Sequence, residues 1–197
     1  MRDRCESQQT MNVLYFDTET NGIGGFRPPS QRVVQVAWDH ADKQSSYLVR
    51  GVEVISPQVP HSFKVKDCSE KGIPFEEIFA EFMTALRTCD IAVAHNIEFD
   101  KGVILNELRI RSMQSDEFLQ LMKTKAYCSM ENTINICRLP KVGKAAIYDG
   151  YKYPKLSDLY VHLTNQQPKL TLHDARNDVQ ILKECINILL GRGDIRF

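Results

Sequence analysis

Three strand-like segments precede the first helix-like segment of this 197-residue chain, and that order constrains its fold most strongly. "VLYFDTE" (residues 13–19) is rich in β-branched and aromatic residues, which is typical of a strand. "RVVQVAWD" (32–39) alternates its side chains between two faces, and "SYLVR" (46–50) follows a polar turn, so the pair predicts an antiparallel hairpin. Helices and strands then alternate, which indicates an α/β domain with a mixed sheet.

The rest of the chain is dominated by helical spacing. Two further short strands are expected at residues 91–96 and 126–130. Apolar stripes with suitable starts and ends predict helices over residues 74–88, 98–110, 116–123, 154–163 and 174–190, with Gly191 as the last cap. With no repeat or linker visible, we expect one domain over residues 12–197 behind a flexible N-terminal segment, residues 1–11.

The composition is that of a soluble globular protein. Lys+Arg and Asp+Glu are equal at 25 each, so no net charge attracts a long duplex or a membrane. No apolar run is as long as a transmembrane helix, and the N-terminus is too polar for a secretory signal peptide. The six cysteines form no CxxC pair, which favours reduced intracellular thiols over a zinc or disulfide framework. We expect a soluble, intracellular protein without a membrane partner.

Two acids end the first strand. Asp17 and Glu19 are two residues apart, so both side chains face the same side of the sheet. Neighbouring carboxylates repel each other unless a positive charge lies between them, and Mg²⁺ prefers carboxylate and phosphate oxygens. The simpler interpretation is a pair of strand-end acids that point into solvent.

A third acid, Asp100, follows the strand-like "AVAHN" where the chain turns into a helix. It therefore lies near the carboxyl edge of the sheet, where α/β proteins usually bind ligands. The alternative is that Asp100 is simply an acid at a helix start, where the helix dipole favours a negative charge.

"HDARND" combines a histidine and two aspartates at the start of the last helix. If the helix begins at Asp174, His173 lies in the preceding loop, free to reach a site. Asp174 is then well placed as the N-cap, whereas Asp178, one turn further on, has no capping role. The spacing therefore predicts a structural Asp174 and a ligand at Asp178.

The segments "FDTETNG", "HNIEFD" and "HDARND", in this order, resemble the three exonuclease motifs of DnaQ-like 3′–5′ exonucleases of the DEDDh type. The likeness runs from about residue 12 to residue 190, and "YPKLSDLY" is also similar to a stretch often seen in these enzymes. The ordered set, with a histidine followed by x4-D, is much more specific than any one motif. The resemblance implies a ribonuclease H-like fold, with a five-stranded mixed β-sheet flanked by helices.

The resemblance also implies the roles of the site residues. Asp17, Glu19, Asp100 and Asp178 are expected to hold two Mg²⁺ or Mn²⁺ ions, and His173 is expected to be the general base. Two ions about 3.5–4 Å apart activate a water and stabilise the leaving oxygen of a phosphodiester. A histidine with a pKa of about 6.5 can take the proton of that water near neutral pH. The expected reaction is 3′–5′ hydrolysis of single-stranded nucleic acid to 5′-mononucleotides, with DNA slightly favoured over RNA.

Residues beside the motifs are expected to bind the terminal nucleotides. In the family, the residues after the first acidic pair hold the terminal nucleotide, although here they can also simply cap the turn before Gly22. Residues 138–155 carry five basic residues and three tyrosines, a composition that suits single strands and also suits a solvated loop. The expected substrate-binding residues are Thr18, Thr20, Asn21, His95, Asn96, Tyr151 and Lys155.

Two other functions stay open. One is a non-catalytic nucleic-acid- or protein-binding module on the same fold, and the other is a ribonuclease H-type endonuclease. None of the four acids and the histidine is lost, which disfavours the first, and the x4 spacing disfavours the second. The expected partner is nucleic acid with a free 3′ end; a loose association with a polymerase or repair complex is compatible with this, as is a monomer or a homodimer.

Overall fold

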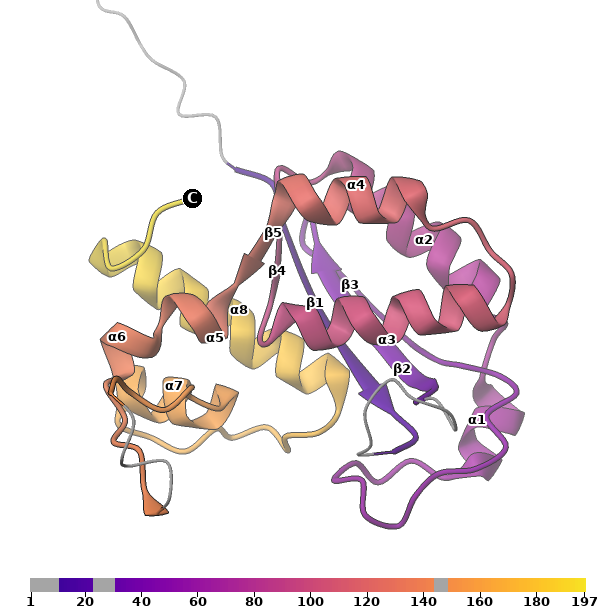
Figure 1. Cartoon of the computed structure of the whole chain (residues 1–197), viewed down its shortest axis with the longest axis horizontal. Coiled ribbons are helices and arrows are strands. Elements are labelled where there is room, and N and C mark those ends of the chain that lie inside the picture. The colour runs from indigo at the N-terminus through magenta and orange to yellow at the C-terminus, as the bar shows by residue number, and fades with distance from the viewer. Residues whose placement is uncertain (1–10, 23–30, 144–148) are drawn as a thin grey trace, which may run out of the picture.

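A computed structural model describes residues 11–22, 31–143 and 149–197 (Figure 1). Five strands form one mixed sheet in the order β3-β2-β1-β4-β5. The central strand β1 is antiparallel to β2 and parallel to β4. The strands are β1 (Val13–Thr20), β2 (Val33–His40), β3 (Lys43–Leu48), β4 (Ile91–Ala94) and β5 (Ala126–Cys128). The five-stranded mixed sheet expected from the sequence is confirmed. The expected N-terminal segment 1–11 lies, except for Met11, outside the described residues.

The β2–β3 hairpin differs from its prediction in one respect. β3 begins at Lys43 and ends at Leu48, whereas residues 46–50 were expected. A two-residue turn at Ala41 and Asp42 joins the strands, and both turn residues have positive φ angles, 50° and 59°. Such turns usually carry Asn or Gly, so "AD" gave no signal that the second strand starts immediately.

Helices cover both faces of the sheet (Figure 1). On one face, Leu14, Phe16 and Trp38 pack among the buried side chains of α2, α3 and α4. On the other, Tyr15 and Ala37 pack against α7 and α8. These helices are α2 (Phe75–Thr88), α3 (Ile97–Ile110), α4 (Asp116–Lys125), α7 (Leu156–Thr164) and α8 (Ala175–Arg192).

Three short helices had no sequence prediction: α1 (Val65–Lys71), α5 (Ser129–Asn132) and α6 (Ile134–Cys137). α5 starts directly after β5, so this strand is shorter than the expected residues 126–130. The last helix also ends later than expected. Gly193, at φ 73°, is its C-cap in place of Gly191, because the left-handed conformation that closes the helix occurs only there. No helix among the described residues has both the length and the apolar character needed to cross a bilayer.

Candidate active site

A cavity of about 480 Å³ opens at the carboxyl end of β1. All four predicted ligand acids and the predicted base lie in its wall: Asp17, Glu19, Asp100, His173 and Asp178. They come from three elements that are far apart in the sequence, namely β1, α3 and the start of α8. The structure therefore brings together all five residues that the three motifs singled out.

β1 and α3 are joined at this cavity by a side-chain contact. The main-chain N–H and the hydroxyl of Thr18 both donate to Oδ1 of Asp100, at 3.0 and 2.7 Å. Thr18, between the two acids of the strand, thus holds the Asp100 carboxylate beside them. Asp100 is 1% exposed and lies in the first turn of α3.

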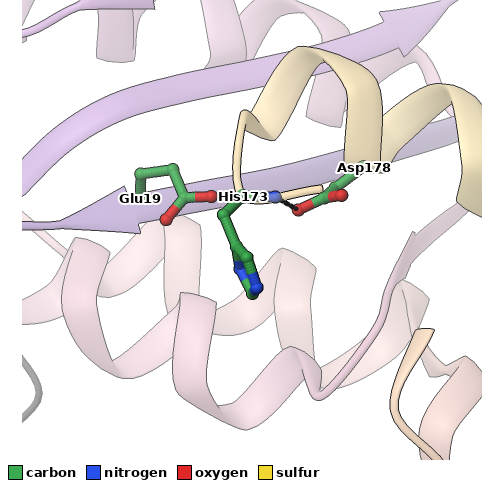
Figure 2. A group of neighbouring side chains, drawn as sticks. All are labelled: Glu19, His173 and Asp178. Atoms are coloured by element: carbon green, nitrogen blue, oxygen red, sulfur yellow. Dashed lines mark hydrogen bonds between the residues drawn. The ribbon is translucent and has the colours of Figure 1, made fainter. Parts of the chain in front are cut away.

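The start of α8 has the arrangement predicted for "HDARND". His173 lies in the loop before the helix, with a positive φ of 65°. Asp174 is the N-cap, and its carboxylate accepts from the main-chain N–H of Arg176 at 3.1 Å. Asp178 accepts from the main-chain N–H of His173 at 3.1 Å through Oδ2 (Figure 2). This bond, which was not predicted, holds the loop to the helix.

Burial raises the pKa of all four acids, and repulsion from neighbouring carboxylates adds to it. Burial, with repulsion from neighbouring carboxylates, raises the pKa of Glu19 to about 8. Burial is also the main cause for Asp100, whose pKa is raised to about 7, and for Asp178, whose pKa is raised to about 6. The pKa of Asp17 is raised well above its usual value by burial and by the three other acids. A cluster of this kind is unfavourable by itself and favours an added positive charge.

The residues present fit a divalent cation. Ligand atoms of Glu19, His173 and Asp178 all lie within 4.8 Å of one another (Figure 2). Oδ1 of Asp178 is buried and has no hydrogen-bond partner. Within the described residues, no lysine or arginine forms an ion pair with any of the four acids. An unsatisfied buried carboxylate oxygen among acids without basic partners is suited to a hard divalent cation.

His173 is exposed, and its pKa is lowered by partial desolvation first and then by the electrostatic effect of Lys155 and His61. A lowered pKa increases the neutral fraction of the imidazole at neutral pH. Lys155 does not line the cavity, but it lies close enough to affect the imidazole of His173 electrostatically.

Three of the expected substrate-binding residues are in the cavity wall: Thr18, Thr20 and His95. The hydroxyl of Thr20 donates to the Gly22 carbonyl at 2.9 Å, as expected for a residue that caps this turn. The ring of His95 contacts the hydroxyl of Ser129 and the carbonyl of Pro154, each at 2.9 Å. His95 therefore connects β4 to the chain just before α7.

The other four expected residues lie outside this wall. The side chain of Asn21 is bonded to the main chain of Arg32 and Val54, which joins two loops. Asn96 is the exposed, left-handed residue that precedes α3. Tyr151 and Lys155 are exposed on the segment before α7, and part of the basic stretch, residues 144–148, lies outside the described residues.

Sequence reasoning missed several wall residues. Gln31, Val59 and Pro60 line the cavity, and Phe99 both packs against the core and lines the cavity. The ring N–H of the buried His61 donates to the Thr20 carbonyl at 2.8 Å. None of the segments around residues 31 and 59–61 carries a motif, so only the folded chain places them here.

The five-stranded mixed sheet with helices on both faces defines an α/β fold of the ribonuclease H-like class. No protein-family model and no curated protein matches the sequence. Among solved structures, cell-death related nuclease 4 (CRN-4) is similar, with a TM-score of 0.64 and 12% identity over 92% of this chain and 64% of that one.

Two further nuclease structures share the fold. The nuclease domain of 3′hExo, a DEDDh family member bound to rAMP, has a TM-score of 0.62 and 11% identity over 94% of both chains. The pseudoubiquitin hydrolase–RNA exonuclease module of Saccharomyces cerevisiae Pan2, in complex with AAUUAA RNA, has a TM-score of 0.58 and 9% identity over 96% of this chain and 30% of that one. At such identities the likeness establishes the fold alone.

Proposed function

We propose that this chain is a divalent-metal-dependent 3′–5′ exonuclease that hydrolyses single-stranded nucleic acid to 5′-mononucleotides. The observation that carries the proposal is the convergence of four acids and a histidine in one cavity. Nuclease structures with the same fold support it. In this proposal residues 12–197 form a single catalytic domain that acts as a monomer or a homodimer, alone or loosely associated with a polymerase or repair complex.

The proposed ligands of two Mg²⁺ or Mn²⁺ ions are Asp17, Glu19, Asp100 and Asp178. Bound ions of this kind lower the pKa of a water and neutralise charge on the attacking and leaving oxygens. The chain itself contributes the geometry. Thr18 holds Asp100 against β1, and the His173 main chain holds one oxygen of Asp178, so its other oxygen stays free.

His173 is the proposed general base. Its lowered pKa keeps the imidazole neutral at pH 7, so a ring nitrogen can accept the proton of the attacking water. Because it lies in the loop before α8, the imidazole can approach a substrate without moving the helix. The proton is then free to pass to solvent, since His173 is exposed.

The proposed substrate enters from the exposed side of the cavity. Val59, Pro60 and Phe99 offer apolar surface to an unpaired base, and Thr20 and His95 lie beside them. Beyond the wall, Tyr151, Tyr153 and Lys155 are exposed, a combination of aromatic rings and positive charge that grips single strands without reading sequence. The sequence slightly favoured DNA, and the 3′hExo and Pan2 complexes with rAMP and RNA support RNA as a substrate too.

A degradation assay tests the proposal. Single-stranded DNA, single-stranded RNA and a mismatched duplex end, each labelled at its 5′ end, are incubated with Mg²⁺, with Mn²⁺ or with chelator. We expect a ladder that shortens from the 3′ end in either metal, and none with chelator or in Asp17→Ala. Internal cuts would identify an endonuclease, and binding without cleavage in both metals would identify a non-catalytic module.

A further inference from the structure

A glutamine on β2 contacts the start of α8 directly beside the acidic cluster. Gln35 pairs with Glu19 across the antiparallel β1–β2 ladder, so both side chains project from the same face of the sheet. This is the face that α8 covers. Gln35 is 4% exposed and does not line the cavity, so it has no access to a substrate.

The carboxamide of Gln35 uses both of its ends on α8. Its Oε1 accepts from the main-chain N–H of Ala175, the first residue of the helix, at 2.9 Å. Its Nε2 donates to Oδ1 of Asp174 at 3.0 Å and to the hydroxyl of Ser46 at 3.0 Å. Asp174 in turn caps Arg176. The N-terminal cap of α8 is therefore shared between two side chains about 140 residues apart, one local and one from the sheet.

This shared cap lies between the groups that the proposed reaction needs. His173 and Asp178 flank the capped turn, and the bond between them makes loop and helix start one unit. Gln35 connects that unit to the strand position opposite Glu19. A buried carboxamide with both ends bonded fixes position more firmly than apolar packing, which allows sliding.

We propose that Gln35 is a positioning residue of the active site, which sets His173 and Asp178 at their distance from Glu19 by holding the first turn of α8. The inference rests on the proposed function, because it assigns a role within the same metal site. It adds a residue that belongs to no motif and touches neither substrate nor metal.

Gln35→Met, which keeps the length of the side chain and removes its hydrogen bonds, tests the proposal. We expect Mn²⁺ affinity, measured by calorimetry without substrate, and kcat each to fall by about 10- to 100-fold, as for groups that orient metal ligands. KM for the oligonucleotide should stay close to the wild-type value, because Gln35 is outside the cavity. If Gln35 has only a structural role, the substitution should lower the melting temperature and leave the Mn²⁺ affinity of the folded protein unchanged.

Gln44→Met is the matched control. Gln44, on β3, also makes three side-chain bonds to α8, with Arg176 and Gln180, but on the solvent side and away from Glu19. We expect a smaller loss of thermal stability, because water can replace these exposed bonds, and unchanged Mn²⁺ affinity and kcat. Equal effects of the two variants on Mn²⁺ affinity, or wild-type affinity in Gln35→Met, would overturn the proposal.

If Gln35→Met does not fold, Gln35→Asn keeps a buried carboxamide that is one methylene too short for both contacts, and the same losses are expected. Failure of the proposed exonuclease function and failure of the role proposed for Gln35 give different results. Absence of degradation by the wild type would refute the exonuclease, whereas the Mn²⁺ titrations would still decide the role of Gln35.

Discussion

Asp174 and Asp178 lie one helical turn apart at the start of α8, but their surroundings give them different chemistry. The carboxylate of Asp174 is occupied by the N–H of Arg176 and the carboxamide of Gln35. Asp178 is 9% exposed, and one of its oxygens is buried without a partner. The carboxylate of Asp174 is therefore used in contacts within the protein, whereas Asp178 has an oxygen that is free to bind a ligand.

Asp174→Ala should therefore lower stability more than activity. Removing the cap should cost about 1 kcal/mol of unfolding free energy, measured by urea denaturation. Activity should largely survive, because the bond from Ala175 to Gln35 remains. Asp174→Asn is the control, since asparagine caps as well as aspartate and should keep wild-type stability. Loss of Mn²⁺ binding in a folded Asp174→Ala protein would instead make Asp174 a ligand.

The raised pKa of Glu19 predicts how the stability of the metal-free protein depends on pH. Its pKa is about 8 in the folded state and about 4.5 when unfolded, so folding takes up a proton between these values. The contribution of this group is most favourable below about pH 4.5 and is lost as the pH rises toward 8. Glu19→Gln, which removes it, should gain stability over the wild type between pH 5 and pH 8. The expected gain grows from about 1 kcal/mol at pH 5 to about 4 kcal/mol at pH 8, since each pH unit between the two pKa values is worth about 1.4 kcal/mol.

The measurement is chemical denaturation of both proteins in chelator at the two pH values. A difference in stability that does not change with pH would contradict the prediction.

At the scale of elements, a buried acid connects α3 to the beginning of β2. The Glu107 side chain is fully buried and accepts from Arg32 in a two-point contact at 2.8 and 2.7 Å, and from Arg111 at 2.7 Å. Burial opposes the charge, but the two arginines lower the pKa of Glu107 below its usual value. Through this group, α3, which carries Asp100, is held against the strand next to β1.

Arg32→Ala should leave the buried Glu107 carboxylate only partly paired. Truncating one member of a buried, hydrogen-bonded charge pair costs about 2–5 kcal/mol, and the partial exposure of Arg32 points to the lower end. Arg87→Ala is the matched control, because Arg87 makes the same two-point contact with Glu117 on the open surface. That pair should contribute little, since solvent screens it. Unfolding free energies are measured by urea denaturation. Equal losses in the two variants would contradict the prediction that Arg32 stabilises a buried charge.

At the scale of the whole molecule, the acidic site is a source of instability that a ligand relieves. Four acids from β1, α3 and α8 are held close together with raised pKa values. The same packing that builds the core enforces this repulsion. The folded chain should therefore bind divalent cations in preference to the unfolded chain.

Mn²⁺ should consequently raise the melting temperature. At a concentration one hundred times Kd, binding to the folded state adds about 2.7 kcal/mol. For a protein of this size, 1 kcal/mol moves the melting temperature by about 2–4 °C, so we expect a rise of about 5–10 °C. The rise should be smaller at pH 5.5 than at pH 8, because protons on Asp178 and Glu19 compete with the cation. Differential scanning calorimetry with Asp178→Asn as the control checks this, and an equal rise in that variant would contradict it.

Local patterns were sufficient to predict the strand segments and the main helices, apart from some of their ends, and they singled out the acids and the histidine that meet in the cavity. Period-two spacing places Asp17 and Glu19 on one face, and capping rules separate Asp174 from Asp178, because both depend only on residues a few positions apart. The positive-φ turn at Ala41 and the end of α8 at Gly193 were not predicted, since each depends on a backbone conformation that several sequences can adopt.

What only the tertiary structure decided is which distant side chains meet the site. Gln35 reaches a helix about 140 residues later in the chain, and His61 reaches the Thr20 carbonyl across 41 residues. Asn21 was expected at the substrate, but it joins two loops instead of lining the cavity. Such contacts arise when helices and loops pack on the sheet, and a hydrogen bond between remote residues leaves no periodic signal in the sequence. The acids that define the chemistry are therefore readable along the chain, whereas the groups that position them become visible only in the folded protein.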